Sequence, residues 1–139
     1  WVERSAELFM PGLRALLGEV EVLSARARYE PRASRAPSEW KRLAFEREIG
    51  FFCQRLADRQ WANVVSLGDL PHERDALFQA TEDVPGCWSK SVKLLEKPHL
   101  EQLAREHDVI RRCLGSVVGH IGNLDLAVQD GGTDAQALQ

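Results

Sequence analysis

The sequence predicts an all-α protein: an antiparallel helical bundle with two long heptad-patterned helices, as in a coiled coil, and shorter helices between them. Apolar residues recur at alternating steps of three and four near both ends of the chain, which places them along one stripe of a helix. We find no strand-like alternation of apolar and polar residues. Because each apolar stripe needs another apolar face to cover it, the helices are expected to pack into a bundle.

Length and composition indicate one folded domain. The 139 residues are 44% hydrophobic and 28% charged, with a formal net charge of -3, which matches neither a disordered chain nor a basic nucleic-acid binder. We assign residues 1–129 to a single helical-bundle domain and 130–139, rich in Gly and poor in apolar residues, to a flexible tail. The chain begins at Trp1 within a helical pattern, so we expect a domain of a longer protein.

The cysteines are odd in number and widely spaced: Cys53, Cys87 and Cys113. This pattern predicts neither a disulfide framework nor a CxxC metal site. Reduced thiols favour an intracellular location, cytoplasmic or nuclear. No apolar run approaches the roughly 18 residues of a membrane helix, so no membrane association is expected.

The first element is predicted from a stripe with alternating spacing of four and three residues: Val2, Ala6, Phe9, Leu13, Leu16, Val20, Leu23 and Ala27. Pro11 interrupts this stripe because proline lacks an amide hydrogen and crowds the preceding turn. We therefore expect a kink there, or a short helix followed by a second one that starts near Pro11. The Pro-containing segment 30–37 then predicts a loop.

A second helix is predicted from Glu39, with its apolar face marked by Phe45, Ile49, Phe52 and Leu56. The sequence leaves open whether it breaks near Asp58 or continues through Trp61 and Val65. In either case we expect Gly68 to end it as a left-handed cap.

Two short helices and one long helix complete the prediction. Pro71 suits a first helical position, and Leu70, Leu77 and Val84 mark one face of a helix closed by Pro85-Gly86. Another short helix is expected around Trp88, Val92 and Leu95. The last helix is predicted from Leu100 to Val128, on a stripe of Leu100, Leu103, His107, Ile110, Leu114, Val117, Ile121, Leu124 and Val128.

His107 is the residue on that stripe that could carry chemistry, as a ligand or a proton-linked switch. We prefer a buried structural histidine, because no companion metal ligands are patterned nearby. Cys113 is interpreted as a packing residue. No HExxH, phosphate loop, GxSxG or dinucleotide fingerprint occurs. We therefore expect no catalytic residues, no metal and no cofactor.

Partner-binding candidates come from three features. Gly115, Gly119 and Gly122 share a side of the last helix, and such glycines favour close approach by another helix of the bundle or by a partner backbone. Trp61 stands at an element end and suits an interface anchor. The remaining candidates are the arginines Arg28, Arg32 and Arg35.

These arginines belong to a basic stretch from Arg26 to Arg42, interleaved with Tyr29 and Trp40. Arginines beside aromatics suit nucleic acid or an acidic protein surface. Because Glu30 and Glu39 dilute the charge and the whole chain is acidic, we prefer a solvated loop and do not expect nucleic-acid binding.

The sequence thus favours a non-catalytic protein-protein interaction or oligomerisation module, a scaffold or adaptor domain with a protein partner or a second copy of itself. One alternative is a helical-bundle enzyme or small-ligand binder that uses His107. A further alternative is a nucleic-acid-binding module that uses the Arg26–Arg42 stretch.

Overall fold

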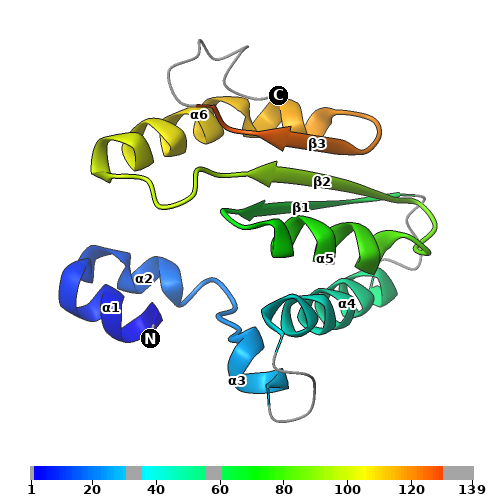
Figure 1. Ribbon diagram of the computed structural model, residues 1–139, viewed down its shortest axis with the longest axis horizontal. Coiled ribbons are helices and arrows are strands. Elements are labelled where there is room, and N and C mark those ends of the chain that lie inside the picture. The colour runs from blue at the N-terminus through cyan, green and yellow to red at the C-terminus, as the bar shows by residue number, and fades with distance from the viewer. Residues whose placement is uncertain (1, 31–35, 56–60, 130–139) are drawn as a thin grey trace.

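The computed structural model describes residues 2–30, 36–55 and 61–129, and it is a mixed α/β structure (Figure 1). The predicted all-α bundle with coiled-coil helices is therefore wrong, because three parallel strands form a sheet. The elements are α1 (Val2–Phe9), the 3-10 helix η1 (Pro11–Leu13), α2 (Arg14–Leu17), α3 (Ala25–Tyr29), α4 (Pro37–Arg55), β1 (Ala62–Gly68), α5 (Pro71–Thr81), β2 (Cys87–Lys93), α6 (Leu100–Gly119) and β3 (Leu124–Ala127).

The sheet has the strand order β1-β2-β3, with a helix on each face. Ser89 of β2 bonds to Thr81 of α5, whereas the next residue, Lys90, bonds to carbonyls at the end of α6. Since successive strand residues point to opposite faces, α5 and α6 cover opposite faces. The chain steps across the sheet in one direction, so the two connections have opposite hands, and one has the left-handed sense that parallel sheets rarely use.

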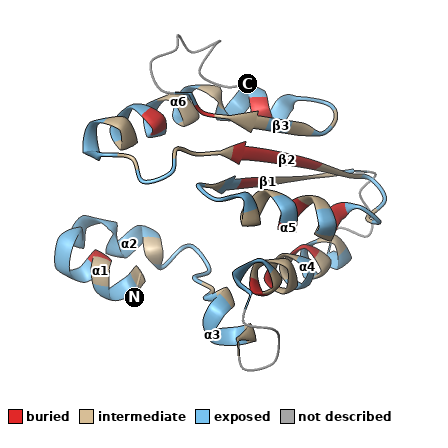
Figure 2. Ribbon diagram, in the orientation of Figure 1, coloured by how far each residue is buried: buried red, intermediate tan, exposed pale blue. Residues whose placement is uncertain are grey.

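Strands replace helices in two segments whose residues face helices on both sides of the sheet. Val64, Val65 and Leu67 lie in β1, a run that also fits one side of a helix, and Gly68 ends this strand rather than capping a helix. The short helix predicted around Trp88 is β2, the central strand, in which four consecutive residues from Ser89 to Val92 are buried (Figure 2). Strands of parallel sheets do not alternate in polarity, because helices cover both of their faces.

The last predicted helix ends nine residues early. His99 and Gln102 form a reciprocal capping box at the start of α6, and the helix stops at Gly119. Gly122 then adopts a φ of +125°, a conformation that favours glycine. This turn leads the chain into β3, so the apolar residues Leu124 and Leu126 extend the sheet instead of the helix.

The helices α4 and α5 lie where the sequence predicted helices, although α5 ends at Thr81, so Leu70 and Val84 of the predicted face lie outside it. The second predicted helix is α4, and Pro71 is the first residue of α5 as expected. The side chains of α4 pack on α5, which in turn packs on β1 and β2. The four layers are thus α6, the sheet, α5 and α4. The position near Asp58, where the sequence left a break open, and the predicted tail at 130–139 lie outside the described residues.

The N-terminal segment forms short helices with little core. As expected, the helical stripe breaks at Pro11, where η1 begins after α1. Ala6 is the one buried residue of α1, η1, α2 and α3 (Figure 2). The exposed large apolar side chains of this segment are Leu8, Phe9, Met10, Leu13, Leu16, Val20 and Val22.

Candidate protein-binding surface

Two tryptophans stack at the amino ends of β1 and β2. Their ring centroids lie 5.1 Å apart with the planes inclined by 24°, which is an offset-stacked arrangement. Trp61 immediately precedes β1 and is 54% exposed, whereas Trp88 is half-buried. The sheet therefore presents the face of a large aromatic ring to solvent, held in place by a second ring.

The end of α6 is fixed beside this aromatic pair by hydrogen bonds to its last carbonyls. The Asn63 Nδ2 group donates to the Val118 oxygen at 3.3 Å. The Lys90 ammonium, in a residue with no exposed surface, donates to the oxygens of Val118 at 2.9 Å and His120 at 2.7 Å. A cation at a helix C-terminus satisfies orphan carbonyls and opposes the negative end of the helix dipole.

These bonds bring together an exposed apolar surface, which we call the Trp61 patch. Val118 is 44% exposed and Ile121 is 78% exposed. Gly119 lies between them in sequence, and a Cβ atom added there would meet nothing within 4 Å. The members of the patch are Trp61, Val118, Gly119 and Ile121.

Burial lowers the pKa of the Lys90 ammonium below its ordinary value of 10.5. Between the lowered pKa and 10.5 the unfolded chain binds more protons at this residue than the folded one, so its contribution to stability rises with pH. We expect the difference in unfolding free energy between the natural chain and Lys90→Met to move in favour of the natural chain from pH 8 to 10.5. Urea unfolding over that range measures it, and a pH-independent difference would contradict it.

The three glycines that the sequence singled out have different surroundings in the structure. Gly119 follows Val118, whose carbonyl is bonded by Asn63 two residues after Trp61, so we include both sequence candidates in one surface. Gly115 and Gly119 both have open space where a Cβ would stand, which means that they do not pack against another helix within the described residues. Gly122 serves the turn into β3 through its positive φ.

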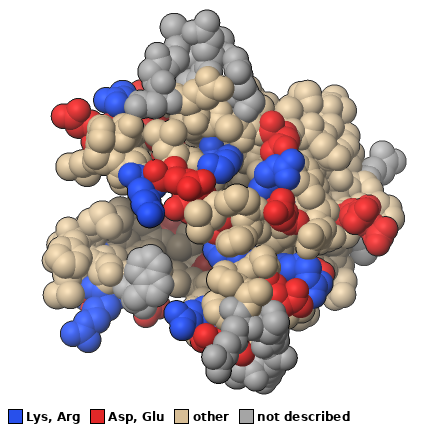
Figure 3. Space-filling view, in the orientation of Figure 1, with Lys and Arg blue, Asp and Glu red and all other residues tan. Residues whose placement is uncertain are grey.

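The basic stretch is neutralised by carboxylates. Arg28 lies 3.6 Å from Glu48, and Arg42 bonds to both Glu39 and Glu46. Figure 3 shows blue and red side chains intermixed over the face in view, not a continuous basic surface. Arg32 and Arg35 lie outside the described residues. The arginine candidate Arg28 is therefore remote from the Trp61 patch and engaged with α4.

The predicted burial of His107 is wrong, because His107 is exposed and its neighbour Glu106 is 1% exposed. The Glu106 carboxylate accepts a 2.6 Å hydrogen bond from the Leu95 amide, which ties α6 to the segment after β2. Cys113 lines a small apolar hollow with Val92 and Val117, in keeping with a packing role. Burial also raises the pKa of the Cys87 thiol, which disfavours a nucleophilic thiolate at neutral pH.

Sequence reasoning missed a polar cluster at the carboxyl end of β1. Asp69 follows the strand, and Glu73 in the first turn of α5 pairs with Lys41 of α4. The Glu73 side chain is 13% exposed, and its Oε2 atom has no hydrogen-bond partner among the described residues. Ligands of open parallel sheets bind at this edge. The signal was the order Gly68-Asp69-Leu70-Pro71, which marks a strand-to-helix turn once β1 is recognised.

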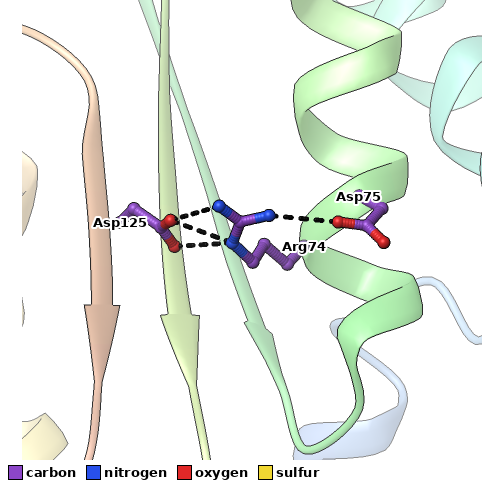
Figure 4. Close-up of polar contacts among 3 residues, drawn as sticks. All are labelled: Arg74, Asp75 and Asp125. Atoms are coloured by element: carbon purple, nitrogen blue, oxygen red, sulfur yellow. Dashed lines mark hydrogen bonds and ion pairs between the residues drawn. The ribbon is translucent and has the colours of Figure 1, made fainter.

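A second ion pair joins α5 to the far strand. Arg74 directs its guanidinium at Asp125 of β3, with Nε 3.0 Å from Oδ1 and 2.9 Å from Oδ2, and its Nη1 atom contacts Asp75 at 3.1 Å (Figure 4). This bidentate geometry fixes α5 across the sheet. Both Arg74 and Asp125 are more than 40% exposed, so the pair is a structural tie of modest strength.

Across the three described ranges, no helix has the length and apolar character needed to cross a membrane. Within the same ranges, no three His, Cys, Asp or Glu side chains are grouped so that they could hold a metal ion. Comparison of the chain with protein-family models, with curated proteins and with solved structures gave no match. The geometry of the exposed surfaces is therefore the basis for a functional proposal.

Proposed function

We propose that the chain is a non-catalytic protein-protein interaction module of the scaffold or adaptor type, and that the Trp61 patch is its binding surface. The observation that carries the proposal is the exposed Trp61 ring, stacked on Trp88 at the start of β1, which Asn63 ties to the end of α6 with its exposed Val118 and Ile121. Tryptophan is enriched among the residues that dominate binding energy. The open space at Gly119 admits close approach of a partner backbone.

The surroundings of the patch support a protein partner. Trp88 and the bonded end of α6 hold the patch before binding, so little conformational entropy is lost on association. The free thiols Cys53, Cys87 and Cys113 favour an intracellular setting for the complex, cytoplasmic or nuclear. The neutralised arginines favour a protein partner or a second copy of this chain over nucleic acid.

The proposal is tested by a photo-crosslinking amino acid placed at residue 121 in the full-length protein, in its own cells. We expect a discrete protein adduct at 121, and none from the same group placed at exposed residue 51 on α4. An adduct of twice the chain mass would identify a second copy. Equal labelling from both positions would contradict the proposal.

Gly119→Leu provides the matched variant for this experiment. A Cβ atom at Gly119 has open space around it among the described residues, so we expect the fold to be retained while the approach surface is blocked. We expect Gly119→Leu to abolish the adduct at 121, whereas Gly50→Leu, at an equally open glycine of α4, leaves it unchanged. Circular dichroism confirms the fold of both variants.

Trp61→Ala is expected to weaken binding of the captured partner by roughly 30-fold, equivalent to about 2 kcal/mol for a central tryptophan. Trp61 is more than half exposed, so its loss changes the unfolding free energy much less than the binding free energy. Titration of the purified pair and urea unfolding measure the two quantities. A variant that binds normally would remove Trp61 from the interface.

A second candidate function, small-ligand binding, is favoured by the unpartnered Oε2 atom of Glu73 at the carboxyl end of β1. A carboxylate oxygen accepts a donor hydrogen or coordinates a cation. The test is thermal denaturation with Mg²⁺ alone and with ethanolamine alone. A rise in Tm that Glu73→Gln abolishes supports this function, and no rise with either ligand counts against it.

A further inference from the structure

A cavity of about 700 Å³ lies between the N-terminal segment and α4, away from the Trp61 patch. Its volume falls in the range of about 300–1,000 Å³ that small-molecule sites occupy. The lining residues come from α1 (Val2 and Glu3), from the segment that leads into α3, from α4 and from Val64 of β1. The apolar side chains that make most of the lining are Val22, Leu23, Trp40, Ala44, Phe45 and Ile49.

Both cations of the lining, Arg26 and Lys41, are engaged within the protein. The Arg26 guanidinium bonds to Glu30 at 3.0 Å and lies 5.7 Å from the centroid of the Trp40 ring. Lys41 pairs with Glu73. A ligand that carried a charge would have to compete with these carboxylates or be desolvated without a partner of its own.

Of the other polar groups of the lining, Glu3 of α1 is exposed, so its carboxylate stays hydrated, whereas Glu48 and Ser24 have partners within the protein. Glu48 lies 3.6 Å from Arg28. The Ser24 oxygen caps α3 by accepting a 3.2 Å hydrogen bond from the Ala27 amide. The polar groups at Ser24, Arg26, Lys41 and Glu48 thus stabilise the walls and have their main interactions satisfied, which leaves the apolar surface as the chief source of binding energy.

We infer that this cavity binds a neutral, apolar small molecule with an aromatic ring system. The aromatic side chains of Trp40 and Phe45 supply faces and edges that suit an aromatic ligand. The inference is independent of the proposed protein partner, because the cavity shares no residue with the Trp61 patch.

The test is fluorescence titration of the full chain with N-phenyl-1-naphthylamine, a neutral fluorophore that emits strongly only in apolar surroundings. Its matched anionic counterpart, 1-anilinonaphthalene-8-sulfonate, has the same ring system with an added sulfonate. We expect saturable binding of one neutral dye per chain, and binding of the sulfonate at least about tenfold weaker because its charge finds no free partner. Equal or tighter binding of the sulfonate would overturn the assignment of a neutral ligand.

Two variants test whether the dye binds in the cavity. Val22→Glu adds a carboxylate at the cavity rim, and we expect it to weaken binding of the neutral dye about tenfold or more. Val20→Glu is the matched control in the same loop, at an exposed residue outside the lining, and should leave binding unchanged. Loss of binding in both would assign the dye to the exposed N-terminal segment and overturn the inference.

Ala44→Phe tests the α4 part of the lining by filling the cavity from that helix and is expected to abolish binding. If this variant fails to fold, as circular dichroism would show, the comparison of Val22→Glu with Val20→Glu still decides the question, since both positions are exposed. A folded Ala44→Phe variant with unchanged dye affinity would also overturn the inference.

Discussion

Glu106→Leu is expected to lower the unfolding free energy by about 1–3 kcal/mol, the cost of leaving a buried donor without its charged acceptor. Glu106 is 1% exposed, and its carboxylate accepts the hydrogen bond of the Leu95 amide. The substitution keeps an apolar side chain of similar size, so the loss reports mainly the missing acceptor. Glu106→Gln retains an acceptor oxygen and should lose less.

The matched control is His107→Leu, at the next residue of the same helix. His107 is exposed, so its substitution is expected to change the unfolding free energy by no more than about 0.5 kcal/mol. Urea unfolding of the three variants measures these differences. A larger loss of unfolding free energy at His107 than at Glu106 would mean that His107 is buried, as the sequence predicted, and would contradict the structure.

The inward face of α6 shows how far periodicity determines a helix. The predicted stripe and the observed face share Leu103, Ile110 and Val117, which are half-buried or buried. Between these positions the structure buries Glu106, where the prediction chose its neighbour His107. Both sets follow steps of three and four. The spacing therefore predicts that the segment is helical, but not which side of the helix faces the sheet. A buried carboxylate could not be preferred over a histidine without knowledge of the Leu95 amide that it binds.

The strands were missed for a physical reason. A parallel strand covered by helices on both faces is a short apolar run, which cannot be distinguished from a buried helical turn by periodicity alone. Val64 and Val65 in β1 are examples. The central strand β2 differs, because it buries the polar residues Ser89, Lys90 and Ser91. Proline gave firmer information, because Pro11 and Pro71 restrict the backbone at their own positions, and helices begin at both.

The candidate surface includes two residues that the sequence had singled out. Trp61 was recognised from its size and its place at an element end, and Gly119 from its cost within a helix. Their proximity depends on the pairing of β1 with β2 and on the bonds from Asn63 and Lys90 to the end of α6. These contacts join residues more than twenty-five positions apart in the chain, which a single sequence does not encode in its local pattern.

Leu77→Ala is expected to have the largest effect on stability, a loss of about 3 kcal/mol from the removal of buried methyl groups and the cavity that remains. Leu77 has no exposed surface, and its helix α5 packs on α4 on one side and on β1 and β2 on the other. A cavity at this position therefore affects three layers of the structure. The corresponding fall in Tm is roughly 10 °C for a domain of this size.

Leu70→Ala is the matched control for this prediction, because the sequence placed Leu70 and Leu77 on one apolar face of a single helix. In the structure Leu70 precedes α5 and is 42% exposed, so the same truncation is expected to cost about 1 kcal/mol or less. Calorimetric melting of both variants measures the contrast. Equal losses would mean that both leucines lie in the core, as a continuous helical face requires, and would contradict the packing of α5 between the sheet and α4.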